Sequence, residues 1–205
     1  MQYYCLGLRK LYNGGMGKDF RTASGHAILE KCFKKEVIFK GTVTFRKDTV
    51  VLPNGKKATR EFMDHPGAVA VLPVTDDGKI IFVRQFRYPV GKATLEIPAG
   101  KLHSPKDNTL ARAKAELQEE TGYTAKKIKP LLSYWTSPAF ANEVLHIFTA
   151  EGLRPGASSP DEDEFLRVET LPFEKAWRML KAGQIQDSKT IIALQAWKIK
   201  LLEKI

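Results

Sequence analysis

The sequence predicts an α/β/α sandwich, in which a mixed central sheet lies between helices and an N-terminal β extension precedes the main domain. Two observations predict this α/β (α+β) class. Segments with strand-like composition, separated by turn signals, occupy much of the chain. Helical periodicity interrupts them once near the middle of the chain and returns in its last third.

The elements are expected in the following order. The expected strands cover residues 37–45, 49–53, 56–63, 69–74, 80–84, 95–97, 131–134, 144–150 and 165–170. Turn signals at Asn54-Gly55 and at Asp76-Asp77-Gly78 indicate hairpins. The expected helices cover residues 26–36, 109–121, 172–181 and 187–202. Core candidates on the last helix are Ile191, Ile192, Leu194, Ala196, Trp197, Ile199 and Leu201.

Length and composition indicate one medium domain plus an extension. We expect a basic extension over residues 1–36, dimerising strands over 37–62 and the main domain over 63–205. No segment approaches the roughly 18 to 20 apolar residues that span a bilayer. The two cysteines, Cys5 and Cys32, form no CxxC motif, so a reducing, cytoplasmic compartment is expected.

The net charge of +10 is concentrated in the N-terminal third. Residues 1–60 contain 13 Lys and Arg against 4 Asp and Glu. Such a region could contact RNA or a membrane. However, no RNA-binding motif and no aromatic interleaving accompany the lysines. We therefore expect a solvated basic face that attracts an anionic diphosphate substrate, and no nucleic-acid or membrane partner. A transit peptide ranks behind a structured or frayed extension over residues 1–25.

An acidic triplet lies on one face of the helix expected at 109–121. Glu116, Glu119 and Glu120 are spaced i, i+3 and i+4, where like charges repel. A divalent cation would offset this repulsion, and Mg²⁺ or Mn²⁺ prefers carboxylate oxygen, with phosphate oxygens completing its shell. The triplet alone is also compatible with a solvated face. The helix-ending Gly122 and the apolar stripe of Leu110, Ala113 and Leu117 favour the metal site.

These residues resemble the signature of the Nudix hydrolases, G-x5-E-x7-R-E-U-x-E-E-x-G-U, in which U is apolar. The half from Glu116 to Tyr123 matches it. The first half departs from it, because Asp107 replaces the Glu with one extra residue after Gly100, and Ala115 replaces the Arg. In the family that Glu and Arg brace the loop against the helix. We therefore expect a weaker or differently supported loop with an intact metal trio.

The resemblance covers about residues 40–205, and within the family the chain is similar to the ADP-ribose pyrophosphatase branch. The matching segments are VRQFRYPVG (83–91), EIPAGK (96–101), TSPAFANE (136–143), an acidic loop (161–164) and GQIQDSKTIIALQ (183–195). Branches that cleave GDP-mannose share EIPAGK. The resemblance implies the Nudix fold and divalent-metal-dependent hydrolysis of a diphosphate bond.

The resemblance also implies metal ligands and a catalytic base. Glu116 and Glu120 are the expected principal ligands of Mg²⁺ (or Mn²⁺), and Glu119 shares a metal or its water shell. The carbonyl of Ala99 is the expected extra ligand. The base that activates water is expected from the acidic loop, with Glu164 preferred over Glu162. A solvated acidic turn is the alternative for this loop.

Substrate contacts are implied for five residues. Arg87 matches a phosphate-binding Arg, and Arg84 is either a second such residue or a surface side chain. Arg60 and Glu61 match positions that reach the adenosine end across a homodimer, and Glu143 matches a residue near the terminal ribose and the metal waters. An ordinary surface salt bridge is the alternative for each arginine.

Three functions stay open at this point. The first is hydrolysis of ADP-ribose to AMP and ribose 5-phosphate, and the second is the same chemistry on GDP-mannose or a dinucleotide. The third is a non-catalytic ligand sensor on the same fold. Retention of all three glutamates argues against the sensor, because binding alone needs no cluster of repelling carboxylates.

Overall fold

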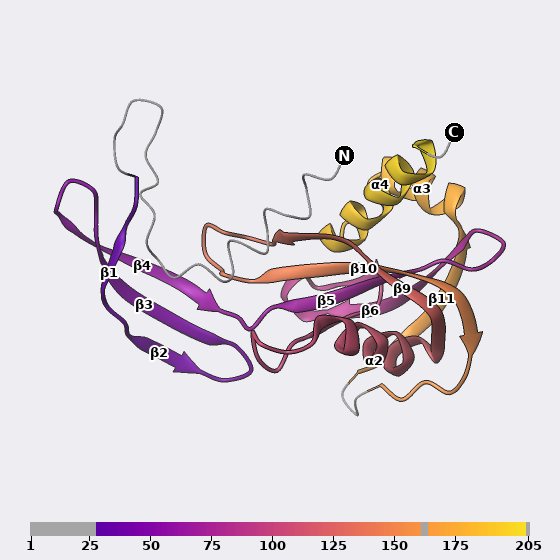
Figure 1. Cartoon of the computed structure of the whole chain (residues 1–205), viewed down its shortest axis with the longest axis horizontal. Coiled ribbons are helices and arrows are strands. Elements are labelled where there is room, and N and C mark those ends of the chain that lie inside the picture. Colours follow the sequence, from indigo (N-terminus) through magenta and orange to yellow (C-terminus); the bar gives the residue numbers. More distant parts are fainter. Residues whose placement is uncertain (1–27, 161–163, 204–205) are drawn as a thin grey trace. The chain divides into compact units, whose positions relative to one another are not determined.

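The structure is a computed structural model that describes residues 28–160 and 164–203. The chain divides into two compact units at the bond between Phe62 and Met63 (Figure 1). Each unit has its own sheet or sheets, and the candidate site belongs to the second unit.

The N-terminal unit is a four-stranded sheet in which one long strand pairs with the other three. Its members are β1 (Lys31–Lys34), β2 (Val37–Lys40), β3 (Thr44–Val51) and β4 (Lys57–Asp64). That strand is β3, and its pairing with β1 and β2 is antiparallel. The helix predicted over 26–36 is wrong where the structure describes it, since Lys31 pairs with Val51 and Cys32 with Val50. Pairing along β3 here overrides a weak local helical pattern.

The second unit contains a mixed sheet, as predicted, and a smaller antiparallel sheet. The mixed sheet has the order β8-β5-β10-β9, with only β5 and β10 parallel. The second sheet has the order β11-β6-β7. Their bounds are Ala68–Pro73 for β5, Lys79–Arg87 for β6, Lys92–Glu96 for β7, Ala99–Lys101 for β8, Tyr123–Trp135 for β9, Val144–Pro155 for β10 and Arg167–Pro172 for β11.

The hairpin expected from Asp76-Asp77-Gly78 forms its turn but not its ladder. One isolated bridge links Val74, directly after β5, to Ile80 of β6, and the two strands themselves belong to different sheets. Every residue of β5 is buried, and its two edges are taken by β8 and β10. The sequence shows the turn but not the competing partners, so this part of the prediction is wrong.

The helices cover both faces of the mixed sheet, which gives the predicted layered fold (Figure 1). Helix α2 (Thr109–Thr121) packs Ala113 and Leu117 against the β5 and β10 side chains of one face. Helices α3 (Phe173–Lys181) and α4 (Ser188–Leu202) contribute to the core on the opposite side. A short 3-10 helix, η1 (Tyr88–Val90), follows β6. No helix within residues 28–160 and 164–203 has both the length and the apolar character required to cross a bilayer.

Helix α4 buries a narrower stripe than the sequence predicted. Leu194 and Trp197 are in the core, together with Ala193 and Thr190. Ile199 is 57 % exposed, so its place among the core candidates is wrong. It lies off the i, i+3, i+4, i+7 stripe that Thr190, Ala193, Leu194 and Trp197 form.

Candidate active site

Helix α2 presents the acidic triplet on a rigid and well-capped element. Its N-cap is Asn108, whose side chain accepts a hydrogen bond from Ala111 N at 3.1 Å. It ends at Gly122 in the left-handed region at φ 75°, as predicted for a C-terminal glycine. Glu116 and Glu120 are buried, with relative exposures of 4 % and 5 %, whereas the Glu119 side chain is 41 % exposed. The triplet is therefore not a solvated face.

The loop before α2 lies directly against these carboxylates. The Ala99 N–H donates a hydrogen bond to Glu120 Oε2 at 3.2 Å. A Cβ atom at position 100 would lie 1.5 Å from Glu116 Oε1, so only glycine allows this approach. The backbone of Ala99 and Gly100 thus lies against Glu116 and Glu120, although the two pairs are well separated in sequence. This is the place at which the Ala99 carbonyl was predicted to act.

The two buried carboxyl groups resist ionisation. Burial raises the pKa of Glu116 to about 7, with a further increase from the charges of Glu119 and Glu164 and an opposing effect of Arg112. Burial likewise raises the pKa of Glu120 to about 8, and the charges of Glu116 and Glu164 add to it. The site therefore concentrates carboxyl groups whose charge the described protein groups neutralise only in part, and an added cation would stabilise it.

Arg112 provides the only ion pairs recorded for this triplet among the described residues. Its Nη2 contacts Glu116 Oε1, and its Nη1 donates to Glu119 Oε2 at 3.2 Å. Arg112 Nε is nevertheless buried without a hydrogen-bond acceptor. No three acidic, His or Cys side chains in the described ranges stand in a geometry that could hold a metal ion. The all-oxygen donor set suits Mg²⁺ or Mn²⁺, although Arg112 lies against two of its members.

Asp107 shows how the loop is supported without the signature Arg. Its Oδ2 accepts hydrogen bonds from His103 N at 2.7 Å and Ser104 N at 3.0 Å. These bonds tie the loop to itself rather than to α2. The departures of Asp107 and Ala115 from the signature therefore replace an ion pair by a side-chain-to-backbone turn.

Glu164 lies close enough to act electrostatically on the triplet. Its charge contributes to the raised pKa values of both Glu116 and Glu120. The preceding segment is fastened to α2, since Ser159 N donates to the Glu119 carbonyl at 2.9 Å. Glu162, the other predicted base, lies outside the described residues.

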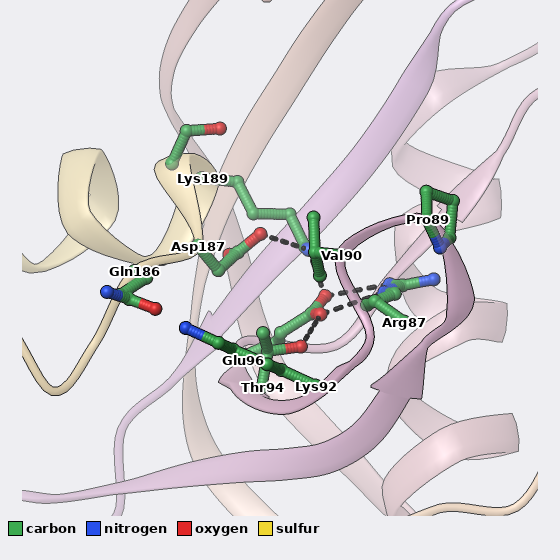
Figure 2. A pocket seen from close by; sticks show the side chains of 10 residues that line it. Arg87, Pro89, Val90, Lys92, Thr94, Glu96, Gln186, Asp187 and Lys189 are labelled. Carbon is green, nitrogen blue, oxygen red and sulfur yellow. Dashed lines mark hydrogen bonds and ion pairs between the residues drawn. The ribbon is translucent and has the colours of Figure 1, made fainter.

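A cavity of about 660 Å³ adjoins this site. Figure 2 shows the side chains that line it, which come from the β6–β7 region and from the start of α4. The lining residues are Arg87, Pro89, Val90, Lys92, Thr94, Glu96, Gln186, Asp187, Ser188 and Lys189. The cavity wall and the acidic triplet interact electrostatically. The charge of Glu120 contributes to the raised pKa of Arg87, and the charge of Lys189 opposes the increase in the pKa of Glu120.

Glu96 is the centre of a hydrogen-bonded network in the cavity wall. Arg87 donates to it through Nε at 2.8 Å and Nη2 at 2.7 Å, and Thr94 Oγ1 donates at 2.5 Å (Figure 2). Lys189 Nζ also binds Glu96, as well as Asp187 Oδ1 at 2.9 Å. Burial opposes ionisation here too, but these donors hold the pKa of Glu96 at about 2.

The network also fixes α4 to the loop of the site. Asp187 caps α4 by accepting from Thr190 N at 2.9 Å and Thr190 Oγ1 at 2.6 Å. Thr190 Oγ1 in turn accepts from Ile97 N at 2.9 Å. Ile97 precedes Pro98 and the Ala99–Gly100 turn, so the cap of α4 and the position of the loop are connected.

The structure places the other predicted substrate residues as follows. Arg84 is paired with Glu169 of β11, at 2.7 Å through Nε, and so is engaged in the small sheet. Glu143 accepts from Thr136 Oγ1 at 2.7 Å and lies 3.5 Å from His65 Nδ1. Arg60 and Glu61 belong to the N-terminal sheet, where they pair with Glu30 and Lys47. Arg87 lies in the cavity wall, with Nη1 outside its pair with Glu96.

Sequence reasoning missed four charged residues of the cavity wall. They are Lys92, Glu96, Asp187 and Lys189. Glu96 and Asp187 stand inside segments that were noted for their resemblance to a family, and Asp187 at the start of the helix expected over 187–202 is also a usable N-cap signal. Lys189 gives no such signal, because a lysine in a helix is usually exposed.

Comparison with known proteins gives matches over most of the chain. A family model described as "NUDIX domain" matches residues 64–194. An ADP-ribose pyrophosphatase of Bacillus subtilis (strain 168) is 46 % identical over 174 residues, which are 83 % of this chain and 94 % of that protein. A methanol dehydrogenase activator of Bacillus methanolicus is 44 % identical with the same coverage.

Two further matches are more distant. A GDP-mannose pyrophosphatase of Yersinia pestis (strain Pestoides F) is 36 % identical over 139 residues, 63 % of this chain and 69 % of that protein. A crystal structure of an ADP compounds hydrolase superposes with a TM-score of 0.74 at 21 % identity, covering 85 % of this chain and 95 % of that one. This last likeness shows the same fold.

Proposed function

Because this chain belongs to the NUDIX family, we propose that it hydrolyses the diphosphate bond of ADP-ribose to give AMP and ribose 5-phosphate. The observation that carries this proposal is the pair of buried carboxylates, Glu116 and Glu120, beside a cavity lined by cationic side chains. The relative at 46 % identity, an ADP-ribose pyrophosphatase, supports the choice of substrate.

Glu116, Glu120 and the Ala99 carbonyl would hold Mg²⁺ (or Mn²⁺), with Glu119 at its water shell. The bound ion would lower the pKa of a water molecule and neutralise diphosphate oxygens. The chain itself supplies the geometry, since Gly100 lets the loop backbone reach the carboxylates and Asp107 keeps that loop folded. The raised pKa values of Glu116 and Glu120 express the same demand for a cation.

The cavity wall would hold the diphosphate. Arg87 is anchored by two hydrogen bonds to Glu96, which fixes its guanidinium while leaving Nη1 outside that pair. Lys92 lines the same cavity and is exposed. Two cations of this kind, one planar and rigid and the other mobile, suit the recognition of phosphate oxygens.

Glu164 would accept the proton of the attacking water, because Glu116 and Glu120 would be engaged by the metal. We expect Glu164→Gln to lower kcat by about 100-fold with little change in KM, as for loss of a general base. Steady-state kinetics on ADP-ribose check this. Glu169→Gln is the matched control, since it neutralises a nearby glutamate that pairs with Arg84. A change confined to KM would remove Glu164 from this role.

A substrate panel tests the activity itself. The panel contains ADP-ribose, GDP-mannose, NADH, diadenosine polyphosphates and CoA, each with Mg²⁺ and with Mn²⁺, and the products are identified. We expect AMP and ribose 5-phosphate to form fastest. Faster release of GMP from GDP-mannose would support the second candidate, which the 36 % identity to a GDP-mannose pyrophosphatase favours. Binding without turnover of any compound would support the sensor instead.

The N-terminal sheet would form a homodimer. It exposes an apolar surface that an isolated sheet in water would not keep. The exposed side chains, between 45 % and 61 % accessible, are Phe33, Val37, Ile38, Phe39 and Phe45. In such a dimer Arg60 and Glu61 would reach the adenosine end of the substrate. We expect Ile38→Glu to give monomers in sedimentation velocity, and an unchanged dimer would contradict this surface. We also infer a reducing cytoplasm from the free Cys32.

A further inference from the structure

Arg112 occupies the space between two members of the acidic triplet. Its guanidinium contacts Glu116 through Nη2 and Glu119 through Nη1, so one side chain bridges two carboxylates one turn apart. The Arg112 side chain is only 24 % exposed, and that of Glu116 is 5 % exposed. The Glu116 half of this bridge is therefore shielded from water and is not an ordinary surface ion pair, whereas the Glu119 side chain is 41 % exposed.

The bridge is incomplete as a permanent structural brace. Arg112 Nε is buried without a hydrogen-bond acceptor, and Glu116 Oε1 has Arg112 Nη2 as its one recorded partner. A brace that lasts through the reaction cycle would be expected to satisfy every buried N–H of the guanidinium. A buried donor without an acceptor, beside a carboxylate oxygen held by a single contact, indicates an arrangement that another partner completes.

Arg112 also makes no recorded contact with the loop that precedes α2, among the described residues. The signature places its Arg at the position of Ala115, three residues later on the helix, and Asp107 here holds the loop through His103 N and Ser104 N. The guanidinium of Arg112 therefore serves the carboxylates alone.

We propose that Arg112 is an internal counter-ion that occupies the carboxylate site until a divalent cation displaces it. The proposal rests on the function proposed above. Glu116 Oε1 is confined by Gly100 on one side and by Arg112 on the other, so the guanidinium must leave this oxygen before it can bind a metal ion. Arg112 thereby weakens metal binding and stabilises the metal-free protein, in which the triplet would otherwise repel itself.

The expected size of the effect follows from a population argument. If the conformer in which Arg112 has left Glu116 is about a tenth of the metal-free molecules, the apparent Kd is weakened about tenfold. Removing the guanidinium makes every molecule competent. Arg112→Gln should then bind Mn²⁺ about tenfold more tightly than the unaltered protein.

Titration calorimetry of the full chain with Mn²⁺ alone tests this, at a pH above the pKa values of Glu116 and Glu120 so that both are ionised. Lys114→Gln is the matched control, because Lys114 is exposed on the same helix and its loss changes the net charge equally. We expect a tighter Kd for Arg112→Gln and little change for Lys114→Gln. Metal-free Arg112→Gln should also have a lower Tm, and saturating Mn²⁺ should narrow that difference.

An equal or weaker Kd for Arg112→Gln would overturn the proposal and make Arg112 a permanent support of the ligands. If Arg112→Gln does not fold, Arg112→Lys replaces it. Lysine has one charged nitrogen in place of the planar guanidinium fork, so it should hold the two carboxylates less firmly and tighten Mn²⁺ binding by a smaller factor. Weaker binding would again overturn the proposal. Failure of every variant and of the unaltered protein to take up Mn²⁺ would instead reject the proposed function.

Discussion

Two regions of the second unit each bury glutamate, with opposite results. Glu96, with a relative exposure of 1 %, keeps its charge, and its pKa is held at about 2. Glu120, with an exposure of 5 %, resists ionisation, and burial raises its pKa to about 8. The extent of burial is similar, so it cannot be the cause of the difference.

The difference comes from what surrounds each carboxyl group. Arg87, Lys189 and Thr94 all donate to Glu96, and two of them carry positive charge. Glu120 receives one backbone N–H, and the charges of Glu116 and Glu164 oppose its ionisation. A saturated buried carboxylate supports structure, whereas an unsaturated cluster of carboxylates attracts a cation.

The largest expected effect is a dependence of stability on pH that separates the two regions. Raised folded-state pKa values mean that Glu116 and Glu120 bind protons more strongly when folded. The metal-free protein should therefore lose several kcal/mol of stability as the pH rises from about 4.5 to about 8, because each pKa unit of difference between folded and unfolded states corresponds to about 1.4 kcal/mol. Glu96 acts in the opposite direction, because its stabilisation is lost as the pH falls from 4.5 towards about 2.

Thermal unfolding in a chelator, measured across this pH range, checks the prediction. Addition of Mg²⁺ should restore the stability lost at alkaline pH and should have little effect at acid pH, where the carboxyl groups are protonated. A metal-free Tm that rises steadily between neutral and alkaline pH would contradict the assignment of unsatisfied charge to α2.

The next effect concerns activity. Glu120→Gln should lower kcat by at least about 100-fold, or about 2.7 kcal/mol, because the metal loses a ligand. The same change should leave the metal-free free energy of unfolding unchanged or higher, since a neutral amide avoids the desolvation of a buried charge. Steady-state kinetics and urea unfolding measure the two quantities. Undiminished turnover would show that Glu120 is not a ligand.

The smallest effect is expected at Glu96, in the cavity wall, and it concerns the free energy of unfolding. Glu96→Gln should lower the free energy of unfolding by about 2 kcal/mol, because Arg87 and Lys189 lose a buried partner. Part of the loss is relieved, since Lys189 keeps Asp187 and the Arg87 side chain is 43 % exposed. Urea unfolding measures this loss. Glu169→Gln is the control, because it breaks the more exposed ion pair between Glu169 of β11 and Arg84, which lies on the same strand, β6, as Arg87. Equal losses in the two variants would show that burial of Glu96 contributes nothing.

The arrangement of the acidic triplet was predictable because its signal is local in sequence. Glu116, Glu119 and Glu120 share a face because the helix repeat places them there, and Gly122 ends the helix because it can adopt positive φ. The partners of the triplet were not predictable in this way. Arg112 was noted as a neighbour, but its bridge to Glu116 and Glu119 depends on side-chain directions that the spacing does not give. Glu96 and Lys189 are 93 residues apart and meet only in the folded chain.

The sequence by itself determined the acidic helix, its glycine stop, most of the strands and the family, because each depends on short-range periodicity or on a contiguous motif. Only the tertiary structure decided that β5 and β6 enter different sheets, that residues 31–34 form a strand, and which buried acids find cationic partners. The physical reason is that pairing and charge compensation depend on competition among groups distant in sequence, and folding brings these groups together.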